Sequence, residues 1–182
     1  MLTNVVTVWF QDTGNPNLMD AMTFTVVVRE CVRPRLGRLI LPPGETGSVP
    51  FNVFTTVPVV DLATYVDIPL DRLVNPGVEA RLPEICTNTI EHFTNDLHLL
   101  TVATCTNQSL MGNQEVAWLY VTADMNPASA FRWLVIGDSV ARQTDGSVVT
   151  NYTGQATRVV IVGEEPLLEA VMDQNRQPQL IL

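Results

Sequence analysis

The sequence predicts an all-β protein, an antiparallel β-sandwich preceded by a β-hairpin. Apolar residues recur at every second position in short stretches, as at Val49, Phe51 and Val53, and this period is typical of half-buried strands. Turns rich in glycine, proline and asparagine separate the stretches at regular intervals, which is the spacing expected of a sandwich. Only residues 70–74 resemble a helical turn.

The N-terminal segment predicts a separate hairpin. Residues 5–10 and 22–30 alternate apolar and polar side chains and are joined by a turn containing Asn15 and Pro16. Two strands alone do not close a core in water. We therefore expect residues 1–33 to be the last hairpin of a truncated preceding domain, and residues 34–37 to be a linker.

Residues 38–163 predict the sandwich itself. Its expected strands are 38–41, 48–55, 61–68, 78–82, 89–94, 97–104, 115–123 and 131–136, with 158–162 as the closing strand. Residues 164–182 end on an apolar run with no turn behind it, so we expect a linker and the first strand of a truncated following module.

Composition excludes several classes of function. The 182 residues carry a net charge of −9, and no basic cluster offsets it, which argues against nucleic-acid binding. All ten basic residues are arginine, so lysine-based chemistry is ruled out. No apolar run is long enough to span a bilayer, and the first residues do not form a secretion signal.

Three cysteines, Cys31, Cys86 and Cys105, lack the CxxC spacing of a zinc site. We interpret them as three buried thiols, because free cysteine packs as a small apolar residue. A bridge between Cys86 and Cys105 is the alternative in an oxidising compartment.

Trp118 and Tyr120 are the leading candidates for ligand binding. If Ala117, Leu119 and Val121 face the core, then Val116, Trp118 and Tyr120 share the opposite face. Two aromatic rings two residues apart would form a flat platform for sugar rings or a protein partner. The interpretation we favour is that a loop or neighbouring domain covers this face.

The other aromatic and polar residues have ordinary structural interpretations. Trp133 lies in a stretch with two apolar faces and is predicted to be in the core, and Trp9 to pack on the missing upstream domain. His92 and His98 could lie on adjacent strands as a two-histidine metal site, but hairpin histidines are the interpretation we favour. Calcium could bind oxygen atoms of Asp12, Asn15, Asn17 and Asp20, although these residues equally suit a turn. No catalytic motif such as GxSxG is present.

Several segments of residues 38–163 resemble a known family. Leu-Pro-Pro-Gly-Glu-Thr-Gly-Ser-Val-Pro-Phe-Asn-Val, ending at Val53, is a glycine turn followed by an alternating strand. Together with residues 65–73, 114–122, 145–149 and 158–162 it resembles cohesin-like modules, the β-sandwiches of extracellular bacterial proteins related to some carbohydrate-binding modules. The approach to the last strand is Tyr-Thr-Gly-Gln-Ala, where dockerin-binding cohesins often show two glycines. Residues 1–30 are similar to the end of a cadherin-like or other immunoglobulin-like repeat.

The resemblance implies a jelly-roll or immunoglobulin-like sandwich at the cell surface or outside the cell. We expect a non-enzymatic module for adhesion, spacing or protein–protein interaction within a larger protein, with a protein partner and its neighbouring domains as contacts. One alternative is polysaccharide binding through Trp118 and Tyr120. A second alternative is a structural subunit of a virion or filament.

Overall fold

The computed structural model describes residues 2–28, 30–151, 155–165, 170–172 and 178–180. Its regular elements are all β-strands, and the all-β prediction is confirmed. The described residues contain no helix that could span a membrane. The chain divides into two compact units, residues 1–30 and 31–182.

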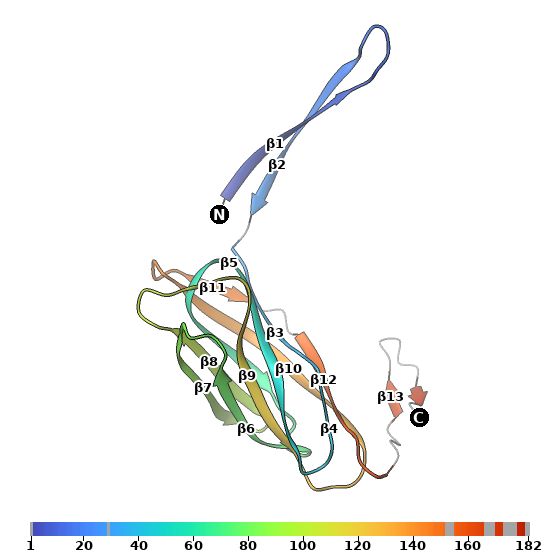
Figure 1. The fold of residues 1–182 in the computed structure, drawn as a ribbon, viewed down its shortest axis with the longest axis vertical. Coiled ribbons are helices and arrows are strands. Elements are labelled where there is room, and N and C mark those ends of the chain that lie inside the picture. Colours follow the sequence, from blue (N-terminus) through green and yellow to red (C-terminus); the bar gives the residue numbers. More distant parts are fainter. Residues whose placement is uncertain (1, 29, 152–154, 166–169, 173–177, 181–182) are drawn as a thin grey trace. The chain divides into compact units, whose positions relative to one another are not determined.

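The first unit is an antiparallel hairpin of β1 (Leu2–Gln11) and β2 (Met19–Val28), as predicted (Figure 1). Val6 pairs with Phe24 and Val8 with Met22, so these four side chains share one face. All four are exposed. That the hairpin belongs to a truncated domain, on which Trp9 packs, stays a prediction.

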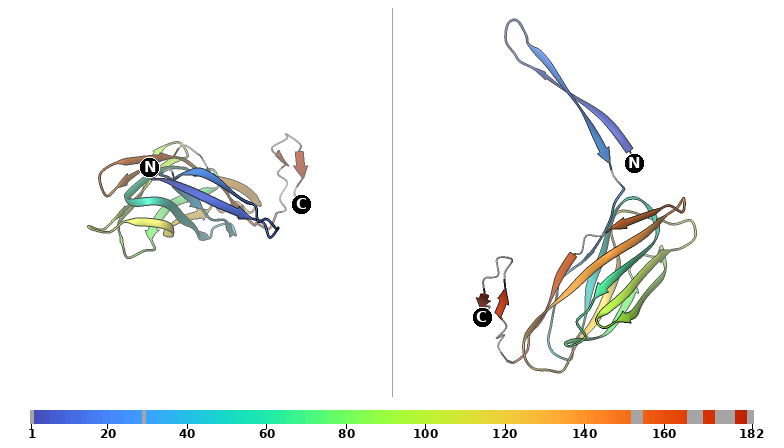
Figure 2. Two further views of the ribbon diagram at one scale, coloured as in Figure 1. Left: turned by 90° about the horizontal axis from the view of Figure 1, so that it is seen from above. Right: turned by 180° about the vertical axis from the view of Figure 1, so that it is seen from behind.

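The second unit contains a sandwich built around one strand, β5 (Thr46–Asp67) (Figures 1 and 2). The pairing of β5 is irregular between Thr55 and Val59. Up to Thr55 it pairs with β3 and β9, and its later residues pair mainly with β8 and β10. One strand therefore belongs to both layers, where the sequence predicts two strands, 48–55 and 61–68.

The smaller sheet has the order β3-β5-β9-β6, and the larger sheet the order β4-β12-β10-β5-β8-β7. The short strand β11 pairs with the end of β10. The pairs are antiparallel except for β4 with β12, which is parallel. The bounds are β3 (Val32–Leu36), β4 (Leu39–Leu41), β6 (Leu73–Ala80), β7 (Ile85–Thr94), β8 (Leu97–Thr104), β9 (Leu110–Ala123), β10 (Ala130–Gln143), β11 (Val148–Asn151) and β12 (Gln155–Ile161).

The core lies between the two sheets and is filled by alternate residues of their strands. Phe51, Leu62, Leu119 and Ile136 are among its largest fully buried side chains. Each such side chain contributes about 1.5–3 kcal/mol on leaving water. Burial of these alternating positions is what the period of two in the sequence predicts.

The prediction of a linker over residues 34–37 is wrong. Residues 32–36 form β3, which pairs with β5 and buries Val32 and Leu36 in the core. Among the described strands β3 pairs only with β5, so it is an edge strand. Pro34 is tolerated there because an edge residue can lack a backbone N–H group.

After Glu165 the described residues form a small hairpin of β13 (Ala170–Met172) and β14 (Pro178–Leu180). That residues 164–182 begin another module stays a prediction. The predicted turn at residues 70–74 is a single turn in which Leu73 N donates to Pro69 O at 3.1 Å. Leu73 is already the first residue of β6.

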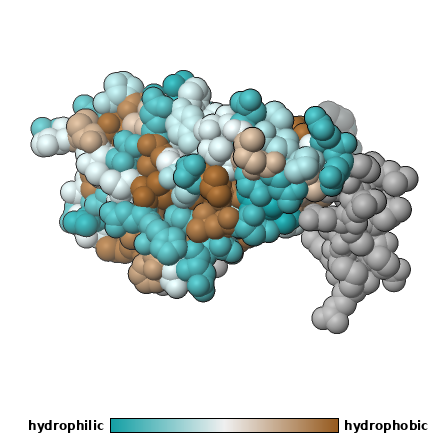
Figure 3. Space-filling view, turned by 90° about the horizontal axis from the view of Figure 1, so that it is seen from below, coloured by the Kyte–Doolittle hydropathy of each residue, from teal (hydrophilic) through white to brown (hydrophobic). Residues whose placement is uncertain are grey.

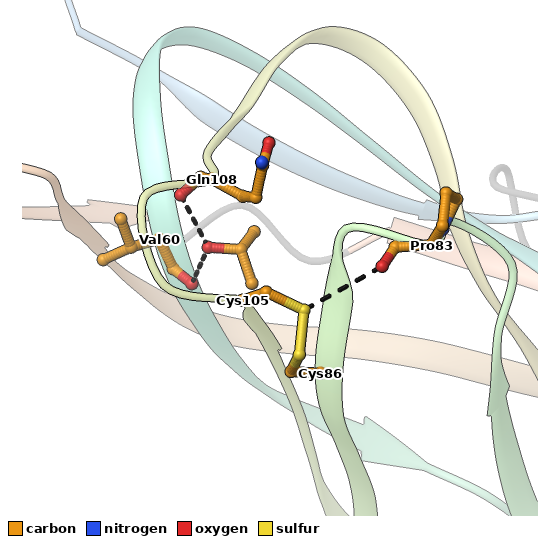
Figure 4. Close-up of a disulfide and its surroundings, with 6 residues drawn as sticks. Val60, Pro83, Cys86, Cys105 and Gln108 are labelled. Carbon is orange, nitrogen blue, oxygen red and sulfur yellow. Dashed lines mark hydrogen bonds between the residues drawn. A yellow bond between two sulfur atoms is a disulfide. The ribbon is translucent and has the colours of Figure 1, made fainter.

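The interpretation of the cysteines as three thiols is also wrong. Cys86 on β7 and Cys105, directly after β8, form a disulfide with a Cα–Cα distance of 4.9 Å (Figure 4). Strand pairing brings them together, because Ile85 pairs with Thr104. Cys31 is the free cysteine of the described chain and is half-buried.

Candidate interaction face

Trp118 and Tyr120 lie on the solvent side of the smaller sheet, since Ala117, Leu119 and Val121 are buried in the core. The predicted place of Val116 beside them is wrong, because Val116 is fully buried. Ala117 pairs with Phe51 and Glu115 with Asn52, so Val116 is the extra residue of a β-bulge.

The two rings do not form a flat platform. Their planes meet at 83° with centroids 6.3 Å apart, and the guanidinium carbon of Arg81 lies 3.7 Å from the centre of the Trp118 ring. Trp118 Nε1 donates to Glu115 Oε1 at 2.9 Å, and the Tyr120 hydroxyl donates to Glu79 Oε2 at 2.5 Å. The side chains that contact the two rings, those of Arg81, Glu115 and Glu79, therefore lie on or beside strands of the same sheet.

Tyr120 is also electrostatically coupled to its neighbours. The hydrogen bond to Glu79 raises the pKa of Tyr120, with smaller contributions in the same direction from burial and from the charge of Glu79. Arg81 acts in the opposite direction. The polar atoms of Trp118 and Tyr120 thus already have hydrogen-bond partners within this cluster of aromatic and charged groups. Little hydrogen-bonding capacity is left for a ligand.

The candidate calcium residues lie in the β1–β2 turn. Asp12 Oδ1 accepts backbone N–H groups of Gly14 at 3.1 Å and Leu18 at 2.9 Å, which is turn-forming chemistry. Asp20 Oδ1 accepts the N–H of Ala21 at 2.8 Å. Asn15 and Asn17 are exposed in the same turn, and calcium binding there stays untested.

His92 and His98 are cross-strand partners at the end of the β7–β8 hairpin, as the sequence predicts. His98 is 2% exposed, whereas His92 is exposed to solvent. Within the described residues no group of three His, Cys, Asp or Glu side chains could hold a metal ion.

The prediction that Trp133 is a core residue is wrong, because Trp133 is 46% exposed. In β10 it is Ala130, Leu134 and Ile136 that face the core. Trp133 points to the opposite side, where Arg158 of β12 lies 5.7 Å from its ring centre. Apolar residues occupy most positions of both alternate sets, so the sequence pattern does not distinguish the two faces.

Trp133 belongs to an apolar surface that we call the outer face, the solvent side of the larger sheet. Register places its members on neighbouring strands, with Val160 between Ile40 and Phe131, and with Tyr65 beside Leu99. The members are Ile40 on β4, Val160 on β12, Phe131, Trp133, Val135 and Val140 on β10, Tyr65 on β5, Leu99 on β8 and Phe93 on β7.

Several of these side chains are strongly exposed, Ile40 by 70%, Phe93 by 61% and Val140 by 46%. The rings of Tyr65 and Phe93 meet edge to face at 5.6 Å. Six strands at a spacing of about 4.8 Å give a sheet surface roughly 25 Å across. Charged groups interrupt it, including the Arg142–Asp61 ion pair at 3.1 Å.

Exposed apolar residues also occur elsewhere on the sandwich. Figure 3 shows them (brown) among polar residues (teal) on the end of the molecule seen from below. Single apolar residues on a surface are common, whereas a contiguous apolar patch with a polar rim marks an interaction site. The outer face gathers apolar residues on neighbouring strands, although Arg158 and Asp67 lie among them, beside Trp133 and Val135.

Several solved structures of other proteins have a fold similar to that of this chain. No protein-family model matches this chain, and no curated protein matches it. A complex containing the cohesin CaCohA2 of Clostridium acetobutylicum matches with a TM-score of 0.64 at 12% identity, over 72% of this chain and 100% of that chain. A type I cohesin–dockerin complex from Clostridium thermocellum matches with a TM-score of 0.60 at 10% identity, over 78% and 98%.

The sixth cohesin of scaffoldin B from Acetivibrio cellulolyticus, solved with a dockerin, also matches with a TM-score of 0.60. It is 11% identical over 71% of this chain and 98% of its own. The chain therefore has the cohesin-like β-sandwich fold, and this expectation from the sequence is confirmed. The resemblance of residues 1–30 to a cadherin-like or other immunoglobulin-like repeat stays a prediction.

Proposed function

We propose that this chain is a non-catalytic protein-interaction module that binds a partner protein through the outer face of its larger sheet. The observation that carries the proposal is the group of half-buried and exposed apolar side chains on neighbouring strands of that sheet. Aromatic residues are typical of the centre of a protein interface. Phe131, Trp133, Tyr65 and Phe93 supply the aromatic part.

The partner class we propose is a dockerin. The solved complexes whose cohesins share this fold contain dockerins, and this chain spans nearly the full length of those cohesins. The approach to the last strand, where this sequence differs from many dockerin-binding cohesins, includes residues 152–154, which lie outside the described residues.

An extracellular or cell-surface location is the setting we propose. The Cys86–Cys105 disulfide supports it, because disulfides persist in oxidising compartments and are rare in the cytosol. Adhesion or spacing within a larger surface protein is the role that we propose in this setting.

A surface plasmon resonance experiment tests the proposal. The immobilised chain is titrated with the dockerins of the solved Clostridium and Acetivibrio complexes, first as wild type and then as the double variant Phe93→Ala, Val140→Ala. Both side chains are exposed, so the double variant should fold. We expect at least one dockerin to bind, and the Kd of that complex to rise at least tenfold, about 1.4 kcal/mol.

The matched control is Met111→Ala, Met125→Ala, which removes two strongly exposed apolar side chains that lie off the outer face, on β9 and in the loop after it. This control should bind like the wild type. Equal loss in both double variants would contradict the role of the outer face. Failure of every dockerin to bind would overturn the proposed partner class.

A further inference from the structure

A second candidate site lies away from the outer face, at the edge of the sandwich between β6 and β7. There a cavity of about 430 Å³ is lined by Leu70, Val74, Asn75, Pro76, Ile90, His92 and His98. The lining is mostly apolar, and it includes the imidazole rings of His92 and His98, whose nitrogen atoms are able to bind a metal ion. These rings meet edge to face, with centroids 5.3 Å apart.

Strand pairing fixes the two histidines opposite one another. His92 of β7 pairs directly with His98 of β8, one step before the hairpin turn. Side chains directly opposite in an antiparallel pair have Cβ atoms about 4.5–5.5 Å apart. Two imidazole rings held at this separation can chelate one ion.

Hydrogen bonds to the backbone set the tautomer of each ring. His92 Nε2 lies 2.7 Å from Asn95 O, and His98 Nδ1 lies 2.9 Å from Asp96 O. A carbonyl oxygen only accepts, so each of these nitrogens carries the proton. The lone pairs of the neutral rings are therefore on Nδ1 of His92 and Nε2 of His98.

This arrangement is the one found around bound metals. A histidine that binds a metal almost always donates its other ring N–H to a carbonyl or carboxylate, which orients the ring. Both rings here have that support from a single turn, residues 94–96. Neither free nitrogen has a hydrogen-bond partner in the described structure. His98 lines the cavity although the residue is only 2% exposed.

We infer that His92 and His98 form a binding site for a divalent late first-row transition metal such as Zn²⁺. Imidazole nitrogen suits zinc, copper and nickel, whereas calcium and magnesium require oxygen ligands. No third His, Cys, Asp or Glu joins the pair within the described residues. Water or an external donor completes the coordination, and Asn75 lines the same cavity.

Isothermal titration calorimetry with Zn²⁺ at pH 7.5 tests this inference. The full chain carries Cys31→Ser throughout, which removes the free thiol as a competing ligand. We expect one equivalent of Zn²⁺ to bind, and His92→Ala to raise the Kd at least tenfold. His92 is exposed, so its truncation should leave the fold unchanged, as circular dichroism can check.

The matched control is Glu91→Ala, the preceding residue on β7, whose side chain points to the opposite side of the sheet. Its Kd should stay within twofold of the parent. Absence of Zn²⁺ binding, or a Kd that His92→Ala leaves unchanged, would overturn the inference. Neither result would bear on dockerin binding, because the cavity lies apart from the outer face.

Discussion

Arg72 and Asp124 join two loops of the sandwich through a short ion pair, with Arg72 Nε 2.7 Å from Asp124 Oδ1. The Arg72 side chain is nearly buried and its Nη2 also donates to Asn126 O at 3.2 Å and Ala128 O at 2.7 Å. One guanidinium thus connects the turn before β6 to the loop between β9 and β10.

We expect Arg72→Met to lower the free energy of unfolding by about 2–4 kcal/mol, because it leaves Asp124 and two loop carbonyls without their donor. Urea denaturation measures the change. The control is Arg142→Met, whose exposed ion pair with Asp61 should contribute at most about 1 kcal/mol. Equal losses in the two variants would contradict the special role of Arg72.

Reduction of the Cys86–Cys105 disulfide should destabilise the sandwich. The bridge closes a loop with a sequence separation of 19 residues, and the chain-entropy relation gives about 3 kcal/mol for a loop of this size. Cys86→Ser, Cys105→Ser should therefore melt well below the wild type and lose the response of the melting temperature to reductant. Cys31→Ser should keep that response, and a double variant as stable as wild type would argue against the bridge.

Gly163 tolerates no side chain. A Cβ atom there would overlap the carbonyl oxygen of Pro127, because residues 163–165 run alongside the loop at 127–129. Gly163→Ala should cost about 1–3 kcal/mol of unfolding free energy through steric overlap. Gly77→Ala is the control, since the nearest atom to its added Cβ would be 4.0 Å away; thermal melting distinguishes the two.

The Tyr120–Glu79 hydrogen bond should make unfolding depend on alkaline pH. Its raised pKa means that the folded state holds the Tyr120 proton more tightly than the unfolded state does. The stabilisation is fully present below about pH 10, the ordinary pKa of tyrosine, and is lost as pH rises through the raised value.

Absorbance titration near 295 nm measures this ionisation, with Tyr120→Phe identifying its contribution among the three tyrosines. Glu79→Gln should return the pKa of Tyr120 toward its ordinary value, because a neutral amide is a weaker acceptor than a carboxylate. An unchanged titration in Glu79→Gln would contradict the assignment.

Alternation of apolar residues was sufficient to predict the hairpin and most strands of the sandwich. It failed at β3, because Pro34 and three arginines nearby have the composition of a linker, and only pairing with β5 makes that segment an edge strand. It also divided β5 in two, since the irregular pairing between Thr55 and Val59 interrupts the period of two.

The candidate sites depend on contacts between distant strands, which spacing in the sequence does not report. Trp133 has apolar neighbours on both sides of β10, so only the packing of the sheets shows which side is exposed. Cys86 and Cys105 meet through the register of β7 with β8. For the histidine pair, the sequence predicts adjacency, but the proton positions follow from the turn carbonyls.

Shared membership of β5 in both sheets has a consequence for how the sandwich comes apart. If one sheet unfolds, the other loses part of its strand pairing, because each sheet has one half of β5 as an inner strand. Denaturation of residues 31–163 should then be a single cooperative transition with no half-sandwich intermediate. The many pairings between residues far apart in the sequence further imply slow refolding, on the millisecond-to-second scale.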